Sequence, residues 1–141
     1  MRNAGGDAVG IVTSVLVVAH KTAATPALID AVRERAARGP CRFTLLVPRE
    51  YWDPDTETAA ATIELAVPLL DDAAGSHVDA LIGDSDPFVA VRETLEAGDF
   101  DEVIVSTLPE RVSHWLRRDL PSRVERLGVP VSVVTARQRE P

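Results

Sequence analysis

Aromatic side chains are scarce in this 141-residue chain: they make up 4% of it, although 45% of the residues are hydrophobic. Its core must therefore be built mainly from Val, Leu, Ile and Ala. No segment approaches the roughly 20 consecutive apolar residues of a membrane-spanning helix. Residues 1–10 also lack the long apolar stretch of a secretory signal. We expect a cytoplasmic protein that does not insert into a membrane.

Cysteine and net positive charge are also lacking. Cys41 is the only cysteine, so an internal disulfide bond is excluded and a reducing compartment fits. The formal net charge is −7 and the isoelectric point is near 4.9, whereas a nucleic-acid-binding protein needs a dominant basic surface. We therefore expect no nucleic-acid partner.

No set of side chains predicts catalysis or metal binding. The three histidines, His20, His77 and His114, do not have metal-ligand spacing. No Ser/His/Asp set, carboxylate pair or Cys/His cluster can be tied to a known reaction geometry. We expect no metal and no catalytic residue, which favours a binding protein over an enzyme. A nucleotide hydrolase is the enzymatic alternative.

Short apolar runs alternate with segments of helical periodicity along the whole chain. The runs predict strands at residues 14–19, 43–47, 78–82, 102–105 and 129–134. Helical spacing predicts helices between them, over 27–37, about 55–74, 87–97 and 109–127. Such alternation implies right-handed βαβ crossovers. We expect one three-layer α/β/α domain over 14–135, with a five-stranded parallel sheet of order 3-2-1-4-5, a flexible lead-in at 1–13 and a tail at 136–141.

The ends of the predicted helices carry capping residues. Thr25 precedes Pro26 at the first helix, and Asp55 or Thr56 is placed to cap the second. The motif GDSDP, at 83–87, reads most simply as a turn and a helix start, with Ser85 or Asp86 as the cap and Pro87 as the first helical residue. Over 109–127 we expect one helix or two short ones, broken near Pro121.

A ligand site is expected where the order of the strands reverses, between the carboxyl ends of the first and fourth strands. His20, Lys21 and Thr22 follow the first strand, and Ser106 and Thr107 end the fourth. The crevice would be lined by hydroxyls, a lysine and an imidazole. Helix N-termini that begin beside it attract anions.

Three stretches resemble universal stress proteins, which belong to the adenine-nucleotide-binding α/β domains. They are VLVVAHKTAATPAL at 15–28, GDSDPFVAVRETLEAGDFDEVIVST at 83–107, and GVPVSVV at 128–134. More narrowly, STLPERVSHWLRRDLP at 106–121 resembles a glycine-less subgroup found among actinobacterial sequences. The resemblance implies a small binding or signalling module, with ATP or AMP as the candidate cofactor.

The chain departs from the ATP-binding members of that family. Their glycines after the fourth strand let the main chain wrap the phosphates, whereas here Ser106 or Thr107 and Arg111 stand near the first two glycine positions. His20 replaces the aspartate that contacts the nucleoside. We therefore expect no ATP binding in the usual manner. The alternative is nucleotide or small-anion binding in which Arg111 and Lys21 substitute for the glycine loop.

Several aromatic and basic residues keep two interpretations each. Arginines over 111–126 either hold a phosphate or form the solvated face of an amphipathic helix. Trp115 either packs in the core or stacks on a partner. Tyr51 and Trp52 either cover a ring such as adenine or pack against the second helix. The candidate ligand-binding residues are His20, Lys21, Thr22, Thr25, Val47, Ser106, Thr107 and Arg111.

The last predicted strand favours self-association. Residues 129–134 are apolar, stand at the edge of the sheet and carry no charge, and an unpaired edge invites strand addition. We expect a homodimer through this strand, with Val129, Val131 and Val133 at the interface.

Overall fold

The computed structural model describes residues 12–53, 56–109 and 114–136. All strands pair in parallel in one sheet of order β3-β2-β1-β4-β5, which confirms the predicted order. The strands are β1 (Thr13–Val18), β2 (Cys41–Pro48), β3 (Asp79–Gly83), β4 (Glu102–Thr107) and β5 (Val131–Thr135). The helices are α1 (Pro26–Ala37), α2 (Glu57–Ala74), α3 (Pro87–Ala97), α4 (His114–Arg117) and α5 (Leu120–Glu125).

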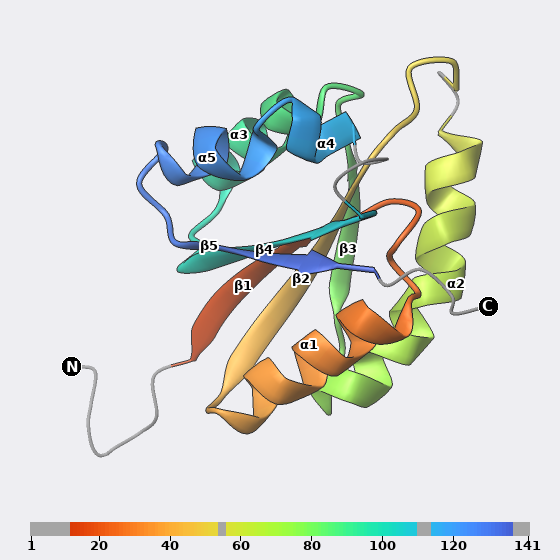
Figure 1. Ribbon diagram of the computed structural model, residues 1–141. Coiled ribbons are helices and arrows are strands. Elements are labelled where there is room, and N and C mark those ends of the chain that lie inside the picture. The colour runs from red at the N-terminus through yellow and green to blue at the C-terminus, as the bar shows by residue number, and fades with distance from the viewer. Residues whose placement is uncertain (1–11, 54–55, 110–113, 137–141) are drawn as a thin grey trace.

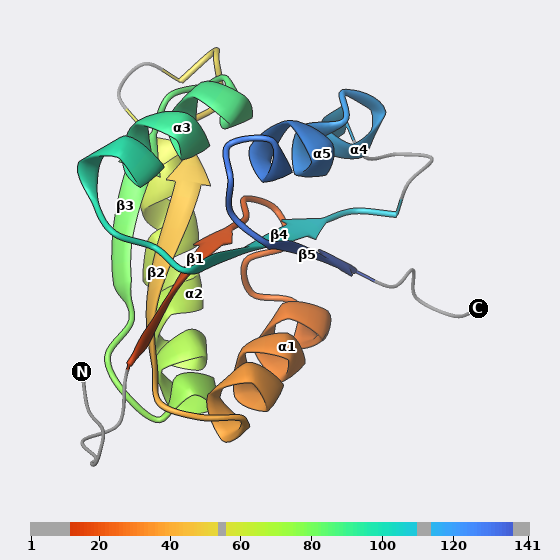
Figure 2. The same cartoon turned by 90° about the vertical axis from the view of Figure 1, so that its left-hand side faces the viewer.

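Helices cover both faces of the sheet, so the predicted three-layer architecture is confirmed. Helices α1 and α2 lie on one face, and α3, α4 and α5 lie on the other (Figures 1 and 2). Because side chains alternate along a strand, β1 serves both layers. Val15 and Val17 pack into the α1/α2 core, whereas Leu16 and Val18 pack into the core beneath α3 and α5.

The starts of α1 and α3 confirm the predicted boundaries, whereas the cap predicted for α1 is not formed. Asp55, one of the two caps predicted for α2, lies outside the described residues. The Thr25 hydroxyl donates to the carbonyl oxygen of Thr22 at 2.8 Å and caps no N–H group of α1. At α2 the N-cap position is Thr56, with a φ of 64° and no side-chain cap. A carboxylate oxygen of Asp53 accepts from the N–H of Thr58 at 2.7 Å instead.

Asp86 caps α3 as predicted. One of its carboxylate oxygens accepts from the N–H groups of Phe88 at 2.9 Å and Val89 at 3.4 Å. Because Gly83 has no side chain, the start of α3 can lie close to β3. A Cβ built on Gly83 would stand 2.7 Å from the Cβ of Ala90 and 2.8 Å from Cδ1 of Leu46. Only glycine permits this close approach of β3 to α3.

The segment after β4 forms two short helices, the second of the two predicted forms. The break falls at Arg118 and Asp119, and Asp119 has a φ of 59° in the left-handed region. Pro121 follows at the start of α5, where its missing N–H leaves no hydrogen bond unmade. In the described part of the chain, no helix combines the length and apolarity needed to cross a membrane.

Candidate functional site

The carboxyl ends of β1 and β4 lie side by side, as the sequence predicts. The two strands are paired in parallel, with Val18 opposite Val105. Just beyond this pair, the hydroxyls of Thr22 and Ser106 are 2.6 Å apart and buried. This bond joins residues 84 positions apart in the sequence and fixes the loop after β1 to the end of β4.

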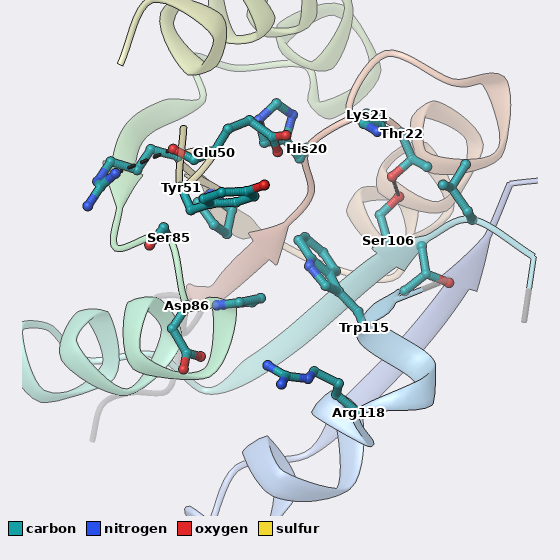
Figure 3. Close-up of a pocket in the computed structure, with 15 residues that line it drawn as sticks. His20, Lys21, Thr22, Glu50, Tyr51, Ser85, Asp86, Ser106, Trp115 and Arg118 are labelled. Atoms are coloured by element: carbon teal, nitrogen blue, oxygen red, sulfur yellow. Dashed lines mark hydrogen bonds and ion pairs between the residues drawn. The ribbon is translucent and has the colours of Figure 1, made fainter. Parts of the chain in front are cut away.

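A cavity of about 590 Å³ opens at this end of the sheet (Figure 3). It is built from the ends of four parallel strands and from the segment after β4, so its walls come from distant parts of the sequence. The lining residues are His20, Lys21, Thr22, Pro48, Arg49, Glu50, Tyr51, Ser85, Asp86, Pro87, Ser106, Thr107, Leu108, Trp115 and Arg118.

His20 forms part of the inner wall. Its side chain is buried, with a residue exposure of 9%, and neither ring nitrogen has a hydrogen-bond partner in the described part of the chain. Nε2 lies 3.5 Å from a carboxylate oxygen of Glu50. Burial lowers the pKa of the imidazole below 6.5, the Glu50 carboxylate opposes this by favouring the charged form, and Lys21 lowers the pKa further. The imidazole is therefore neutral at pH 7.

Thr107 contributes a second polar group without a partner. The residue is 3% exposed, and its hydroxyl has no hydrogen-bond partner among the residues described. Buried hydroxyls usually find a partner, because leaving one unpaired costs about 1–3 kcal/mol. Its carbonyl oxygen is paired, since it accepts from the N–H of Ala136 at 2.8 Å. Thr107 thus has a fixed backbone and a free hydroxyl in the wall of the cavity.

Charged side chains surround the outer part of the cavity. Lys21, Arg49 and Arg118 supply positive charge, and Glu50 and Asp86 supply negative charge. Figure 3 shows Arg118 extending across the mouth in the direction of Asp86. A guanidinium in this place can bind an oxyanion through two parallel hydrogen bonds.

Two aromatic rings approach the cavity from opposite sides. Tyr51 comes from the loop after β2 and Trp115 from α4 (Figure 3). Tyr51 is 84% exposed, which leaves almost its whole ring available to a ligand. Trp115 is half-buried and also packs against the core beneath α3 and α5. Part of the ring therefore belongs to the core, as one interpretation predicts, and part lines the cavity, while stacking on a partner stays a prediction.

No protein-family model matches this sequence, and no curated protein does either. Solved structures do match. A universal stress protein crystallised in complex with cAMP aligns with a TM-score of 0.63 and 17% sequence identity, over 89% of this chain and 98% of that one. The chain has the universal stress protein fold. The expected fold is thereby confirmed, and the narrower glycine-less subgroup stays a prediction.

Five of the predicted ligand-binding residues come together in the universal stress protein fold of this chain. His20, Lys21, Thr22, Ser106 and Thr107 all line the cavity. The sequence could place them because they directly follow, or end, two strands whose adjacency the expected sheet order specifies.

Two predicted contacts lie elsewhere. Val47 is completely buried in the α1/α2 core and does not line the cavity. Strand alternation puts it on the same face as Phe43 and Leu45, away from the ligand side. Thr25 is half-buried at the start of α1, where its hydroxyl bonds Thr22. Arg111 lies outside the described residues.

The prediction missed much of the outer wall. Arg118 was not among the candidate ligand-binding residues, but the break after α4 brings it to the cavity. Arg49 and Glu50 were also missed. They follow β2, whose end neighbours that of β1, so the rule that ligands bind beyond strand ends could have indicated them. Among the residues described, no group of three or more His, Cys, Asp or Glu could hold a metal ion.

Proposed function

We propose that this protein is a small cytoplasmic binding and signalling module of the universal stress protein type, which holds a nucleotide at the ends of β1 and β4. The cavity carries this proposal. Its volume of about 590 Å³ suits a small molecule, and it lies where open α/β sheets bind ligands. The similar structure in complex with cAMP supports a nucleotide as the class of ligand.

Each part of a nucleotide has a suitable group in this cavity. Tyr51 and Trp115 offer rings on which a base can stack. The hydroxyl of Thr107 and the imidazole of His20 can bond to the nucleoside. Arg118 can hold a phosphate group in place of backbone N–H groups. The glycine loop of the ATP-binding members is then not required, and we propose that ATP is not bound in their manner.

We propose binding without turnover. The sequence offers no nucleophile paired with a base, and the protein would act by presenting its ligand-bound form to a partner. A nucleotide hydrolase is the competing function. Incubation of the protein with ATP and AMP, followed by separation of the products, tests it: hydrolysis that survives further purification would make this an enzyme.

Calorimetry with ATP, AMP and cyclic AMP tests the binding function. We expect saturable heat with at least one nucleotide and a rise in the thermal midpoint, since a ligand that binds only the folded state stabilises it. Arg118→Ala should weaken binding by about tenfold or more, which is the scale of a lost charge-assisted contact. Arg33→Ala is the matched control, because Arg33 is exposed on α1 and pairs with Asp30. Absence of heat and of a thermal shift with all three nucleotides would refute nucleotide binding.

Tryptophan fluorescence gives an independent test at the site. The chain has two tryptophans, and Trp52 is 58% exposed on the loop after β2. Trp52→Phe leaves Trp115 as the only reporter. Because Trp115 lines the cavity, we expect nucleotide to change its emission with the same midpoint as the calorimetric titration. An unchanged emission at saturating nucleotide would place the binding elsewhere.

We propose a homodimer as the quaternary form, joined through β5. Val133 is 44% exposed at this sheet edge, whereas Val129 is buried and Val131 half-buried within the protomer. Val133 is therefore the predicted interface residue with most surface left for a partner. Light scattering at micromolar concentration should give twice the monomer mass, and Val133→Lys should shift it toward the monomer. A monomer in both proteins would exclude this assembly.

A further inference from the structure

The cavity is neutral inside and charged outside. The inner wall holds the imidazole of His20 and the hydroxyls of Thr22, Ser106 and Thr107, all of them buried. The charged residues of the lining are half-buried or exposed. The inner part of a bound ligand therefore contacts uncharged hydrogen-bonding groups, and the part near the mouth contacts charged groups.

The inner wall contains unused hydrogen-bonding capacity. His20 and Thr107 are each more than nine-tenths buried, and neither side chain has a hydrogen-bond partner in the described part of the chain. Thr22 and Ser106, by contrast, satisfy each other at 2.6 Å. A neutral imidazole offers one donor and one acceptor, and a hydroxyl can do both. These two groups match the uncharged hydroxyls and ring nitrogens of a nucleoside.

The outer wall carries little net charge. Among the described residues, three cations, Lys21, Arg49 and Arg118, face two carboxylates, Glu50 and Asp86, which leaves a single positive charge. Arg49 is partly engaged already, since one of its N–H groups donates to the carbonyl oxygen of Glu50 at 3.3 Å. The described mouth residues can thus neutralise the single charge of a phosphodiester such as cyclic AMP and about half the charge of AMP, and each further phosphoryl group adds negative charge that the carboxylates repel.

Backbone N–H groups at the start of α3 do not provide a site for a second phosphate group. Among the described helices of eight or more residues, α3 is the one that lines the cavity. A phosphate can bind at a free helix N-terminus, but the Asp86 carboxylate already accepts from the N–H groups of Phe88 and Val89 there. Pro87 at the first position of the helix has no N–H to offer. The start of α3 therefore repels a second phosphate group.

We infer that the cavity selects a nucleotide with a single phosphate group, such as AMP or cyclic AMP, over di- and triphosphates, with the nucleoside held by His20 and Thr107 and the phosphate by Arg118. This inference rests on the proposed nucleotide-binding function. It adds the discrimination by phosphate number and the residues responsible for it.

A ligand series tests the discrimination. Adenosine, AMP, cyclic AMP, ADP and ATP are titrated at one ionic strength and without magnesium, because salt and a bound cation both screen phosphate charge. We expect AMP or cyclic AMP to bind about tenfold more tightly than ATP and than adenosine. ATP binding as tightly as AMP would overturn the inference and leave the proposed function standing. Absence of binding across the series would overturn both.

Glu50→Gln tests the effect of the charge at the mouth of the cavity. The variant removes one carboxylate from the mouth and keeps an oxygen that can accept from the Trp52 indole, as Glu50 does at 3.1 Å. We expect the ratio of ATP to AMP affinity to rise by about threefold to tenfold, mainly through tighter ATP binding. An unchanged ratio would mean that mouth charge does not set the preference.

Thr107→Val tests how much the inner wall contributes to nucleotide affinity. Because the Thr107 hydroxyl has no partner among the residues described, its removal should leave the thermal midpoint of the ligand-free protein unchanged or raise it. The affinity for AMP should fall by about fivefold to tenfold, and Thr107→Ser should retain it. Thr44→Val is the matched control, as Thr44 is buried in β2 outside the cavity. Unchanged affinity in Thr107→Val, or equal losses in the control, would overturn the role of Thr107.

Discussion

The two faces of the sheet are closed in different ways. On one face α1 has 12 residues and α2 has 18, whereas on the other α3 has 11 and α5 has 6. Residues of α3 and α4 line the cavity, and in the described part of the chain no residue of α1 or α2 does. Helices α1 and α2 cover their face without lining the cavity, whereas the elements on the other face leave the strand ends accessible.

The buried polar residues gather around the cavity. Six buried residues are polar or charged in the part of the chain that the structure describes, and four of them, His20, Thr22, Ser106 and Thr107, line the cavity. The α1/α2 core consists of apolar residues. The core beneath α3 and α5 is apolar as well, so most of the buried polar groups belong to the cavity and not to one helical layer.

The largest effect should come from the face that α1 and α2 cover. Leu28, on α1, is fully buried in the α1/α2 core, and Leu28→Ala should lower the free energy of unfolding by about 2–5 kcal/mol. Urea unfolding measures this. Leu120→Ala in α5 is the counterpart on the other face, and it should cost less because a short helix can close over the missing atoms. Equal losses in the two variants would contradict the difference between the layers.

Next in size is the close approach of β3 to α3. Gly83→Ala places a Cβ 2.7 Å from that of Ala90, and the shift needed to relieve the overlap should lower stability by about 1–3 kcal/mol. The shift also moves Asp86 and the cavity wall, so nucleotide affinity should fall. Adding Ala90→Gly removes the clashing atom and should recover part of the stability. Destabilisation that is merely additive in the double variant would show that this contact is not the cause.

A moderate effect is expected at Asp53. The backbone hydrogen bond from Thr58 lowers the pKa of this carboxyl below 3.8, more than burial raises it. Because the folded-state pKa is lowered, the stabilisation is present above 3.8 and is lost as the pH falls through the folded value. Asp53→Ala should lower the thermal midpoint at pH 7 by a few degrees. It should also make the thermal midpoint depend less on pH in the acid range. Asp72→Ala, exposed near the end of α2, is the control. If Asp53→Ala had the same thermal midpoint as Asp72→Ala, a stabilising cap by Asp53 would be excluded.

The smallest effect should be the pH response of His20. Burial lowers the pKa of this imidazole below 6.5, so the unfolded chain takes up a proton before the folded one does. The contribution of His20 is therefore fully present above 6.5 and is lost as the pH falls toward the folded value. Thermal midpoints measured from pH 8 to pH 5 should fall less in His20→Gln than in the parent. His77→Gln should keep the parent slope, since His77 is exposed, and a parent slope in His20→Gln would count against the neutral buried imidazole.

Local sequence predicted the order of the elements and most of their ends. The apolar run at 14–19 predicts a strand buried on both faces, and β1 has buried residues on both. Pro26 and Pro87 mark helix starts because a proline at the first position of a helix sacrifices no hydrogen bond. The contact of Asp53 with the start of α2 was missed, since Asp53 reaches Thr58 through a backbone conformation that spacing alone does not specify.

By itself, the sequence determined that this chain forms alternating strands and helices and that His20 and Thr107 end up at neighbouring strand ends. Hydrophobic periodicity and strand order are enough for that, because both act on whole elements. Only the tertiary structure decided that Val47 faces the core, that Arg118 reaches the cavity, and that the hydroxyl of Thr107 has no partner among the residues described. These properties depend on which side chains meet across long sequence separations, and they are set when the layers pack.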